Sequence, residues 1–99
     1  MATVYFLYSE NDHQWYVGQT TRSIEERFQE HCAGYVKATK ARRPLLLAYY
    51  ELHQHSIDAK RREWHLKHLS GYKEKLQIIA QLLLKKSSWP VQECIVHSV

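Results

Sequence analysis

The chain has 99 residues, of which 44% are hydrophobic and 24% charged, proportions that are ordinary for a single folded domain. Fourteen Lys and Arg against ten Asp and Glu leave a net charge of +4, which weakly favours an anionic partner such as a nucleic acid. No apolar run reaches membrane-spanning length, no signal peptide is evident, and no Cys-x-x-Cys pair indicates a zinc or redox site. We therefore expect a protein of a reducing compartment, cytoplasmic or, in a eukaryote, nuclear.

A β-hairpin is predicted at the start of the chain, where two runs of β-branched and aromatic residues flank a polar turn. The strands are expected at residues 3–8 and 15–20, with the turn at 9–14. If Ser9 pairs with Gln14, Tyr5 lies opposite Gly18, and Tyr5 and Tyr16 are diagonal neighbours on one face of the sheet. Gly18 leaves that face open beside the two phenols, because it has no side chain.

A helix is predicted next, because Ser23 and Glu26 form a capping box and Gly34 ends the pattern. Helical spacing gives this helix three apolar inward side chains: Ile24, Phe28 and Cys32. His31 falls within the inward stripe, and Arg27 lies at its edge, one turn away. Taken singly, His31 is equally well explained as a buried histidine and Arg27 as a rim residue. Their pairing on the core side makes them candidate functional residues.

A basic connector follows at residues 35–43, with four cations and no acidic neighbour in the sequence: Lys37, Lys40, Arg42 and Arg43. Cations spaced in this way can follow a phosphate backbone. An exposed, mobile loop explains the same composition equally well.

A third strand is predicted at residues 45–50, after Pro44. Its apolar run is nearly continuous, as is typical of a strand covered on both faces, so we expect it to be central in the sheet. Residues 51–55 are expected to form a connector. His53 and His55 are interpreted as solvated histidines, because no further ligands accompany them.

A second helix is predicted over residues 57–69, with Ser56 as its cap. Its inward stripe is Ala59, Leu66 and Leu69, and Glu63 lies on that stripe. A buried carboxylate is costly unless it is paired or binds a metal, so Glu63 is either a metal ligand or part of a salt bridge to Arg27 or a lysine. Lys60, on the same helix, is a further candidate for nucleic-acid binding.

A third helix is predicted from about Tyr72 to Lys86, with a core stripe of Leu76, Ile79, Ala80 and Leu83. Residues 87–99 read as a C-terminal extension of unknown role, either a short strand or a tail. The predicted order is β-β-α-β-α-α, which indicates an α+β fold (mixed α/β) with a small antiparallel sheet of at least three strands flanked by three helices.

At four places the sequence resembles the GIY-YIG nuclease superfamily. Thr-Val-Tyr at 3–5 and Tyr-Val-Gly at 16–18 stand where its two name-giving motifs fall, with Thr3 in place of a glycine. Arg-Phe-Gln-Glu-His at 27–31 resembles its Arg-x-x-x-His helix, and 59–63 resembles the helix that carries its glutamate. The resemblance covers about residues 3–80 and is closest to small stand-alone members related to the catalytic domain of the bacterial excision-repair endonuclease. It predicts a nuclease domain over 1–86.

The resemblance implies metal-dependent hydrolysis of DNA phosphodiester bonds by water. Glu63 would hold one divalent ion, Mg²⁺ or Mn²⁺, and Mg²⁺ commonly takes only one or two protein carboxylates. Arg27 would bind the scissile phosphate, and His31 would position a tyrosine or the phosphate. Either Tyr5 or Tyr16 would accept the proton of water.

Two other functions remain open from the sequence. One is a nucleic-acid binding module on the same scaffold with weak or no cleavage, since the asparagine that many members carry after the glutamate has no counterpart here. The other is an unrelated interaction domain in which the tyrosines belong to the core. No zinc finger or helix-turn-helix pattern is evident, so we expect recognition of DNA shape or single strands, in repair, recombination or processing, or a protein partner that supplies specificity. The oligomeric state stays open.

Overall fold

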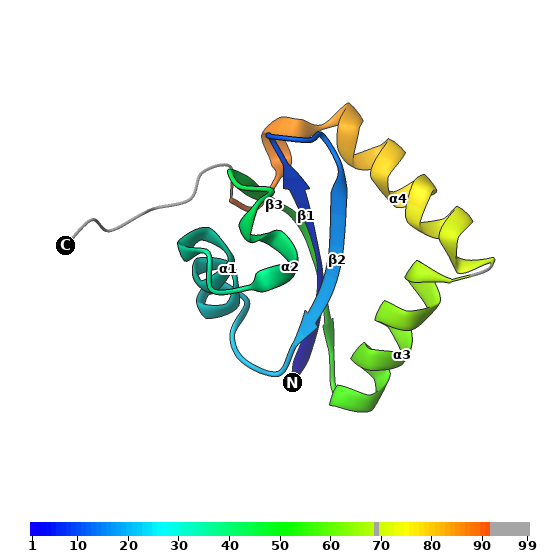
Figure 1. Cartoon of the computed structure of the whole chain (residues 1–99). Coiled ribbons are helices and arrows are strands. Elements are labelled where there is room, and N and C mark those ends of the chain that lie inside the picture. The colour runs from blue at the N-terminus through cyan, green and yellow to red at the C-terminus, as the bar shows by residue number, and fades with distance from the viewer. Residues whose placement is uncertain (69, 92–99) are drawn as a thin grey trace.

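The computed structural model describes residues 1–68 and 70–91 and confirms the α+β fold and the order of its main elements (Figure 1). The elements are β1 (Ala2–Ser9), β2 (Trp15–Thr20), α1 (Ile24–Ala33), α2 (Lys37–Lys40), β3 (Leu45–His53), α3 (Ser56–Lys67), α4 (Gly71–Leu84) and a 3₁₀ turn, η1 (Lys86–Ser88). The short helix α2 lies within the segment that the sequence left as a connector or loop.

The antiparallel sheet has the strand order β2-β1-β3. The predicted hairpin register is confirmed, with Tyr5 opposite Gly18 and Leu7 opposite Tyr16. The prediction that the third strand is central is wrong, because β1 occupies the middle and β3 an edge. The apolar run of β3 is nevertheless buried, since Trp89 packs on Leu46 and Ala48. Its apolar composition therefore reports burial, and not position in the sheet.

The two faces of the sheet are covered by different helices, with α1 and α2 on one side and α3 and α4 on the other (Figure 1). Alternate residues of β1 separate the two cores, because successive side chains of a strand point to opposite faces. Tyr5 and Leu7 pack with Phe28 of α1, whereas Val4 and Phe6 pack with α3 and α4. Tyr5 and Tyr16 therefore both lie on the α1 face.

Helix α1 has the predicted ends. The hydroxyl of Ser23 accepts a hydrogen bond from the Glu26 amide at 3.1 Å, and Gly34 ends the helix with a left-handed φ of 85°. Helix α3 begins one residue earlier than predicted, with extended His55 as its N-cap, so Ser56 is a helical residue and not the cap. Ala59 and Leu66 are buried as predicted, whereas Leu69 lies outside the described residues.

The predicted core stripe of α4 is confirmed for Ile79 and wrong for Leu76, Ala80 and Leu83, which are exposed. Ile79 is buried, but its inward neighbours are Ile78 and Leu82, while Leu76 and Leu83 are 46% and 58% exposed. Residues 76–84 are apolar around most of the helix, so periodicity does not decide which side faces the sheet. The packing of Ile78, Ile79 and Leu82 against the side chains of the sheet decides it. The indole N–H of Trp89 also donates to the Leu82 carbonyl at 3.0 Å.

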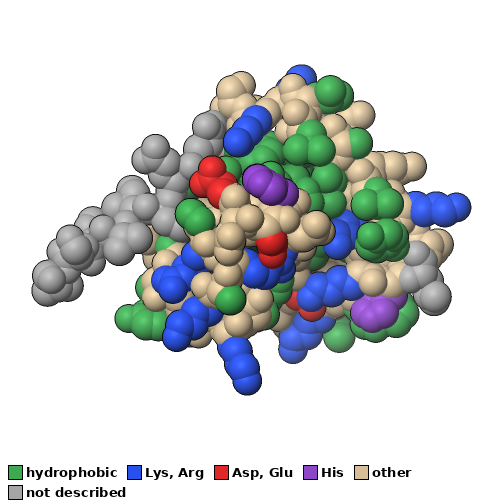
Figure 2. Space-filling view, turned by 45° about the horizontal axis from the view of Figure 1, so that its top comes forward, with side chains coloured by type: hydrophobic (Ala, Val, Ile, Leu, Met, Phe, Trp, Pro, Cys, Tyr) green, Lys and Arg blue, Asp and Glu red, His purple; other side chains and the backbone are tan. Residues whose placement is uncertain are grey.

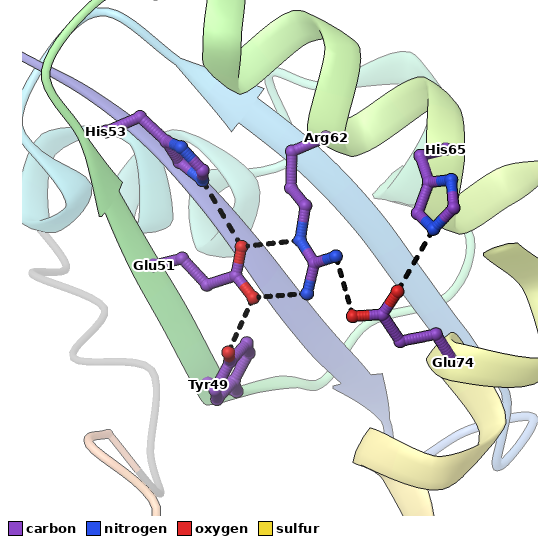
Figure 3. A network of polar contacts seen from close by, with 6 residues as sticks. All are labelled: Tyr49, Glu51, His53, Arg62, His65 and Glu74. Atoms are coloured by element: carbon purple, nitrogen blue, oxygen red, sulfur yellow. Dashed lines mark hydrogen bonds and ion pairs between the residues drawn. The ribbon is translucent and has the colours of Figure 1, made fainter.

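A charged network ties β3, α3 and α4 together (Figure 3). The guanidinium of Arg62 binds both carboxylate oxygens of Glu51 at 2.9 Å and one oxygen of Glu74 at 2.7 Å. Tyr49 donates to Glu51 at 2.6 Å, and His53 contacts the same carboxylate at 3.2 Å. The expected connector at 51–55 is therefore wrong for residues 51–53, which extend β3, and His53 is a partner in this network.

The last described residues pack against the domain. Trp89 is buried, and Val91 forms an isolated antiparallel bridge with Leu47 of β3. The remainder of the expected extension, residues 92–99, lies outside the described part of the chain. None of the described helices is both long and apolar enough to cross a membrane.

Candidate active site

Two tyrosines and a histidine form an aromatic cluster on the α1 face of the sheet. The ring centroids of Tyr5 and Tyr16 are 6.4 Å apart, and His31 lies 5.5 Å from Tyr5 and 5.4 Å from Tyr16. Gly18 makes this approach possible, because a Cβ at that position would come within 2.6 Å of the Tyr5 phenol oxygen and 2.8 Å of the Tyr16 ring. The structure therefore brings the predicted tyrosines together, and any side chain at position 18 would clash with them.

The Tyr5 phenol is held by two residues of α1. Its oxygen lies 2.7 Å from His31 Nε2, and Arg27 Nε donates to it at 3.3 Å. Arg27 also pairs with Glu30 at 3.2 Å, so its guanidinium bridges the site and the exposed side of α1. The predicted placement of His31 inward and Arg27 at the rim is confirmed, since His31 is fully buried and the Arg27 side chain is 28% exposed.

Thr39 of α2 completes this group from the far side of the imidazole. Its hydroxyl oxygen lies 2.7 Å from His31 Nδ1, and its side chain is fully buried. Sequence reasoning missed Thr39, because a single threonine inside a basic segment shows no periodicity that marks it as buried.

Glu63 approaches from α3, across β2. Burial raises the pKa of both Tyr5 and Tyr16 most, and the charge of Glu63 adds to the rise at each phenol. Lys67, one turn along α3, lies 3.8 Å from Glu63 and holds its ammonium 5.4 Å from the centre of the Tyr16 ring. Of the alternatives for Glu63, the structure shows a loose pair to a lysine and not to Arg27. Lys67 was missed, although the i,i+4 spacing from Glu63 is a signal that could have found it.

Burial sets the protonation of the cluster. It raises the pKa of Tyr5 to about 12, against the hydrogen bond from Arg27, and it also raises the pKa of Tyr16. Burial and the Arg27 charge lower the pKa of His31 to about 4. At neutral pH the two phenols and the imidazole are therefore uncharged, and Arg27 supplies positive charge beside them.

The five predicted nucleic-acid contacts fall into two groups. Lys37, Lys40 and Lys60 are exposed, and none of them forms an ion pair within residues 1–68 and 70–91. Arg42 pairs with Asp12 of the hairpin turn at 2.9 Å, an acidic partner from a distant part of the sequence. Arg43 donates to the backbone carbonyls of Lys40 and Cys32. Of the five predicted contacts, the three lysines are thus the exposed cations that bind neither a carboxylate nor a backbone carbonyl within the described residues.

Positive side chains are spread over the face shown in Figure 2, with few acidic side chains between them. The imbalance follows the net charge of +4. Such a surface attracts a polyanion through its long-range field, without regard to sequence.

Glu63 is the candidate metal ligand. Its side chain is 27% exposed and pairs with Lys67, whose ammonium lies over the Tyr16 ring, and a carboxylate oxygen is the donor that Mg²⁺ and Mn²⁺ prefer. Within the described residues, no group of three or more His, Cys, Asp and Glu side chains is arranged to hold a metal ion. An ion at Glu63 would therefore have this one carboxylate as its acidic ligand there, with water and substrate oxygens in its other positions.

Comparisons with known proteins agree with this arrangement. The family model of the GIY-YIG catalytic domain matches residues 1–77. The chain is 39% identical to UPF0213 protein SH2523 of Staphylococcus haemolyticus, over 71% of this chain and 84% of that protein. It is 32% identical to UPF0213 protein CPE1444 of Clostridium perfringens, over 90% of this chain and 94% of that protein.

A solved structure is also similar. The solution NMR structure of UPF0213 protein BH0048 from Bacillus halodurans superposes with a TM-score of 0.50 at 30% identity, over 88% of this chain and 98% of that one. The family match includes both tyrosines, the Arg27–His31 helix and Glu63. With a nuclease-type fold, with the two tyrosines, Arg27 and His31 on the α1 face of its sheet and with Glu63 on α3, the chain belongs to the GIY-YIG family, among the small proteins in which that domain takes up most of the length.

Proposed function

We propose that this protein is a divalent-metal-dependent endonuclease that hydrolyses DNA phosphodiester bonds. The observation that carries the proposal is the contact of Arg27 with the Tyr5–His31 pair, beside a second phenol and within reach of the Glu63 charge. A phosphate bound to Arg27 would lie next to the two tyrosines, where a group that accepts a proton from water is needed.

Arg27 is the candidate phosphate ligand. Within residues 1–68 and 70–91, its Nε is engaged by Tyr5 and one terminal nitrogen, Nη1, by Glu30. A guanidinium has five N–H donors in a planar fork, so donors remain for the oxygens of a phosphate. The same positive charge stabilises the negative charge that builds on the phosphate as water attacks.

Tyr16 is the better candidate than Tyr5 for the group that accepts the water proton. Tyr5 is fully buried, and its oxygen is engaged by both His31 and Arg27. Tyr16 is half-buried, and its phenol oxygen makes no hydrogen bond within the described residues. Attack would form the new P–O bond, break the bond to the leaving oxygen and transfer the water proton to an ionised Tyr16.

Glu63 would hold Mg²⁺ or Mn²⁺ at this site. The ion would supply positive charge to the leaving oxygen. Binding of a cation would also offset the Glu63 charge, which now raises the pKa of both phenols. Ionisation of Tyr16 would therefore be easier in the loaded enzyme, because the charge that opposes it would be neutralised.

The substrate proposed is branched or single-stranded DNA, in repair, recombination or processing. The three exposed lysines Lys37, Lys40 and Lys60 lie on α2 and α3 and suit contacts to a phosphate backbone. Phosphate contacts position a nucleic acid but carry no sequence information. Recognition of DNA structure, with or without a partner that adds specificity, fits this surface.

The proposal is tested by cleavage of labelled single-stranded, duplex and branched DNA with Mg²⁺ or Mn²⁺, with and without a chelator. Glu63→Gln should reduce cleavage by at least ~100-fold, because loss of several kcal/mol of charge stabilisation corresponds to that factor. Glu10→Gln, at an exposed carboxylate in the hairpin turn, is the matched control and should cleave like the wild type. Salt-sensitive DNA binding without any metal-dependent cleavage would contradict the proposal and favour a binding module.

A further inference from the structure

Thr39 links the basic segment to the candidate site. Four-residue α2 exposes Lys37 and Lys40 and buries Thr39 completely. The Thr39 hydroxyl meets the imidazole of His31 at Nδ1, on the side away from Tyr5. The three side chains therefore form a chain of contacts from α2 through α1 to β1.

The direction of these hydrogen bonds follows from counting protons. Arg27 Nε can only donate, so the Tyr5 oxygen accepts from it. The buried Tyr5 hydroxyl then needs an acceptor for its own proton, and within the described residues His31 Nε2 is the atom in place. The reverse arrangement, with His31 donating from Nε2, would leave the Tyr5 proton without an acceptor among those residues. A neutral His31 with Nε2 as acceptor carries its proton on Nδ1.

We propose that Thr39 is a positioning residue of the site: its hydroxyl oxygen accepts the Nδ1 proton of His31 and so holds His31 in the tautomer whose Nε2 accepts the proton of Tyr5. The effect on cleavage rests on the nuclease function proposed above, whereas the tautomer does not depend on it. This series of hydrogen bonds ends at Arg27, because Tyr5 accepts the Nε proton and so fixes the plane of the guanidinium.

Burial and the charges around Thr39, His31 and Tyr5 keep the imidazole and the phenol uncharged. His31 is fully buried and faces Arg27, whose charge opposes a second proton on the ring, while Glu30 acts weakly in the other direction. Tyr5 faces Arg27, Tyr16 and Glu63, and burial keeps its phenol protonated. Because the His31 ring is neutral, the property that Thr39 controls is which of the two ring nitrogens carries the proton.

The expected consequence is an effect on kcat more than on KM. Thr39 lies behind His31 and is fully buried, so its loss removes no surface for DNA. Without the Thr39 oxygen, the His31 ring would no longer be held in one tautomer. The Tyr5 hydroxyl would then lose its fixed acceptor, and the Arg27 guanidinium would lose its fixed orientation. A misplacement of this kind in a positioned group reduces the rate of the chemical step by about 10- to 100-fold.

The experiment is ¹⁵N NMR of the His31 ring at neutral pH, which distinguishes a proton on Nδ1 from one on Nε2. The wild type should show the Nδ1–H form. Thr39→Val has nearly the same shape but no oxygen, and it should lose this form and lower kcat with KM within about two-fold. Thr39→Ser keeps the oxygen and should retain the wild-type tautomer and most of the activity. Thr21→Val, at an exposed threonine before α1, is the matched control and should change neither readout.

A wild-type His31 protonated on Nε2 would overturn the proposal, and so would a Thr39→Val protein with an unchanged tautomer. If Thr39→Val does not fold, the wild-type and Thr39→Ser spectra still show whether His31 carries its proton on Nδ1. A wild type with the Nδ1–H form but no cleavage on any DNA would support the assigned tautomer and refute the nuclease function, so the two failures are distinguishable.

Discussion

Two polar networks lie on opposite faces of one small sheet, and they are built in opposite ways. On the α1 face, Tyr5, His31 and Thr39 are fully buried and linked by contacts of 2.7 Å between uncharged groups. On the α3–α4 face, Arg62 binds Glu51 and Glu74 with side chains that stay 16–41% exposed. One network is dry and neutral, and the other is charged and reaches water.

The difference follows from the cost of burying charge. An ion taken out of water loses several kcal/mol of solvation, and only close partners return it. Burial opposes ionisation of Glu51, yet the hydrogen bonds from Arg62 and Tyr49 outweigh it and lower its pKa. At the candidate site, burial has the larger effect on the pKa values, so His31 and Tyr5 stay neutral. The charged network therefore holds the helices in place, while the neutral one leaves Arg27 and Glu63 as the charged groups of the candidate site.

Breaking the charged network should have the largest effect on stability. Arg62→Met leaves Glu51 and Glu74 without their shared cation, and we expect a loss of about 3 kcal/mol in the free energy of unfolding, at the lower end for a broken ion pair because the groups are partly exposed. Urea unfolding measures it. Arg61→Met, at the exposed neighbouring position, is the matched control and should cost less than ~0.5 kcal/mol. Equal losses in the two variants would show that the network does not support the fold.

The neutral network should show itself as a pH dependence. The pKa of His31 is lowered from 6.5 to about 4, so between these values the unfolded chain binds a proton that the folded chain does not. Stability should therefore fall with falling pH, by about 2 kcal/mol between pH 7 and pH 5.

Unfolding at each pH tests this, and His31→Gln should remove most of the slope. The lowered pKa of Glu51 acts in a different window, since its stabilisation is present above the ordinary value of 4.5 and is lost as pH falls through the folded value. A flat stability between pH 7 and pH 5, followed by a loss below pH 4.5, would show that the carboxylates alone govern the acid response.

The two networks also differ in how far the sequence predicts them. The site tyrosines were predictable, because strand periodicity and a polar turn specify the register that places Tyr5 opposite Gly18. The inward position of His31 followed from helical spacing in the same way. Thr39 was not predictable, since its burial depends on α2 folding back onto α1 and no local pattern encodes that contact.

The charged network was missed because it depends on where β3 ends. Glu51 and His53 follow an apolar run and read locally as a polar connector, and only the pairing with β1 and the contact with Arg62 keep them in the strand. The same limit applies to the strand order and to the inward side of α4. Local composition reports that a segment is buried, whereas the elements that bury it come from distant parts of the chain.

The smallest expected effect separates the two networks by salt. Ions screen partly exposed charges, so raising NaCl from 0.05 to 0.5 M should shrink the Arg62→Met loss by about 0.5 kcal/mol. The Thr39→Val loss, about 1–2 kcal/mol for a buried donor left unpaired, should change by less than ~0.2 kcal/mol, because no net charge is involved. Both are measured as differences from the wild type in the same salt, which cancels the general effect of salt on unfolding. A Thr39→Val loss that follows salt as Arg62→Met does would mean that His31 carries charge in the folded protein, and the contrast between a neutral and a charged network would no longer hold.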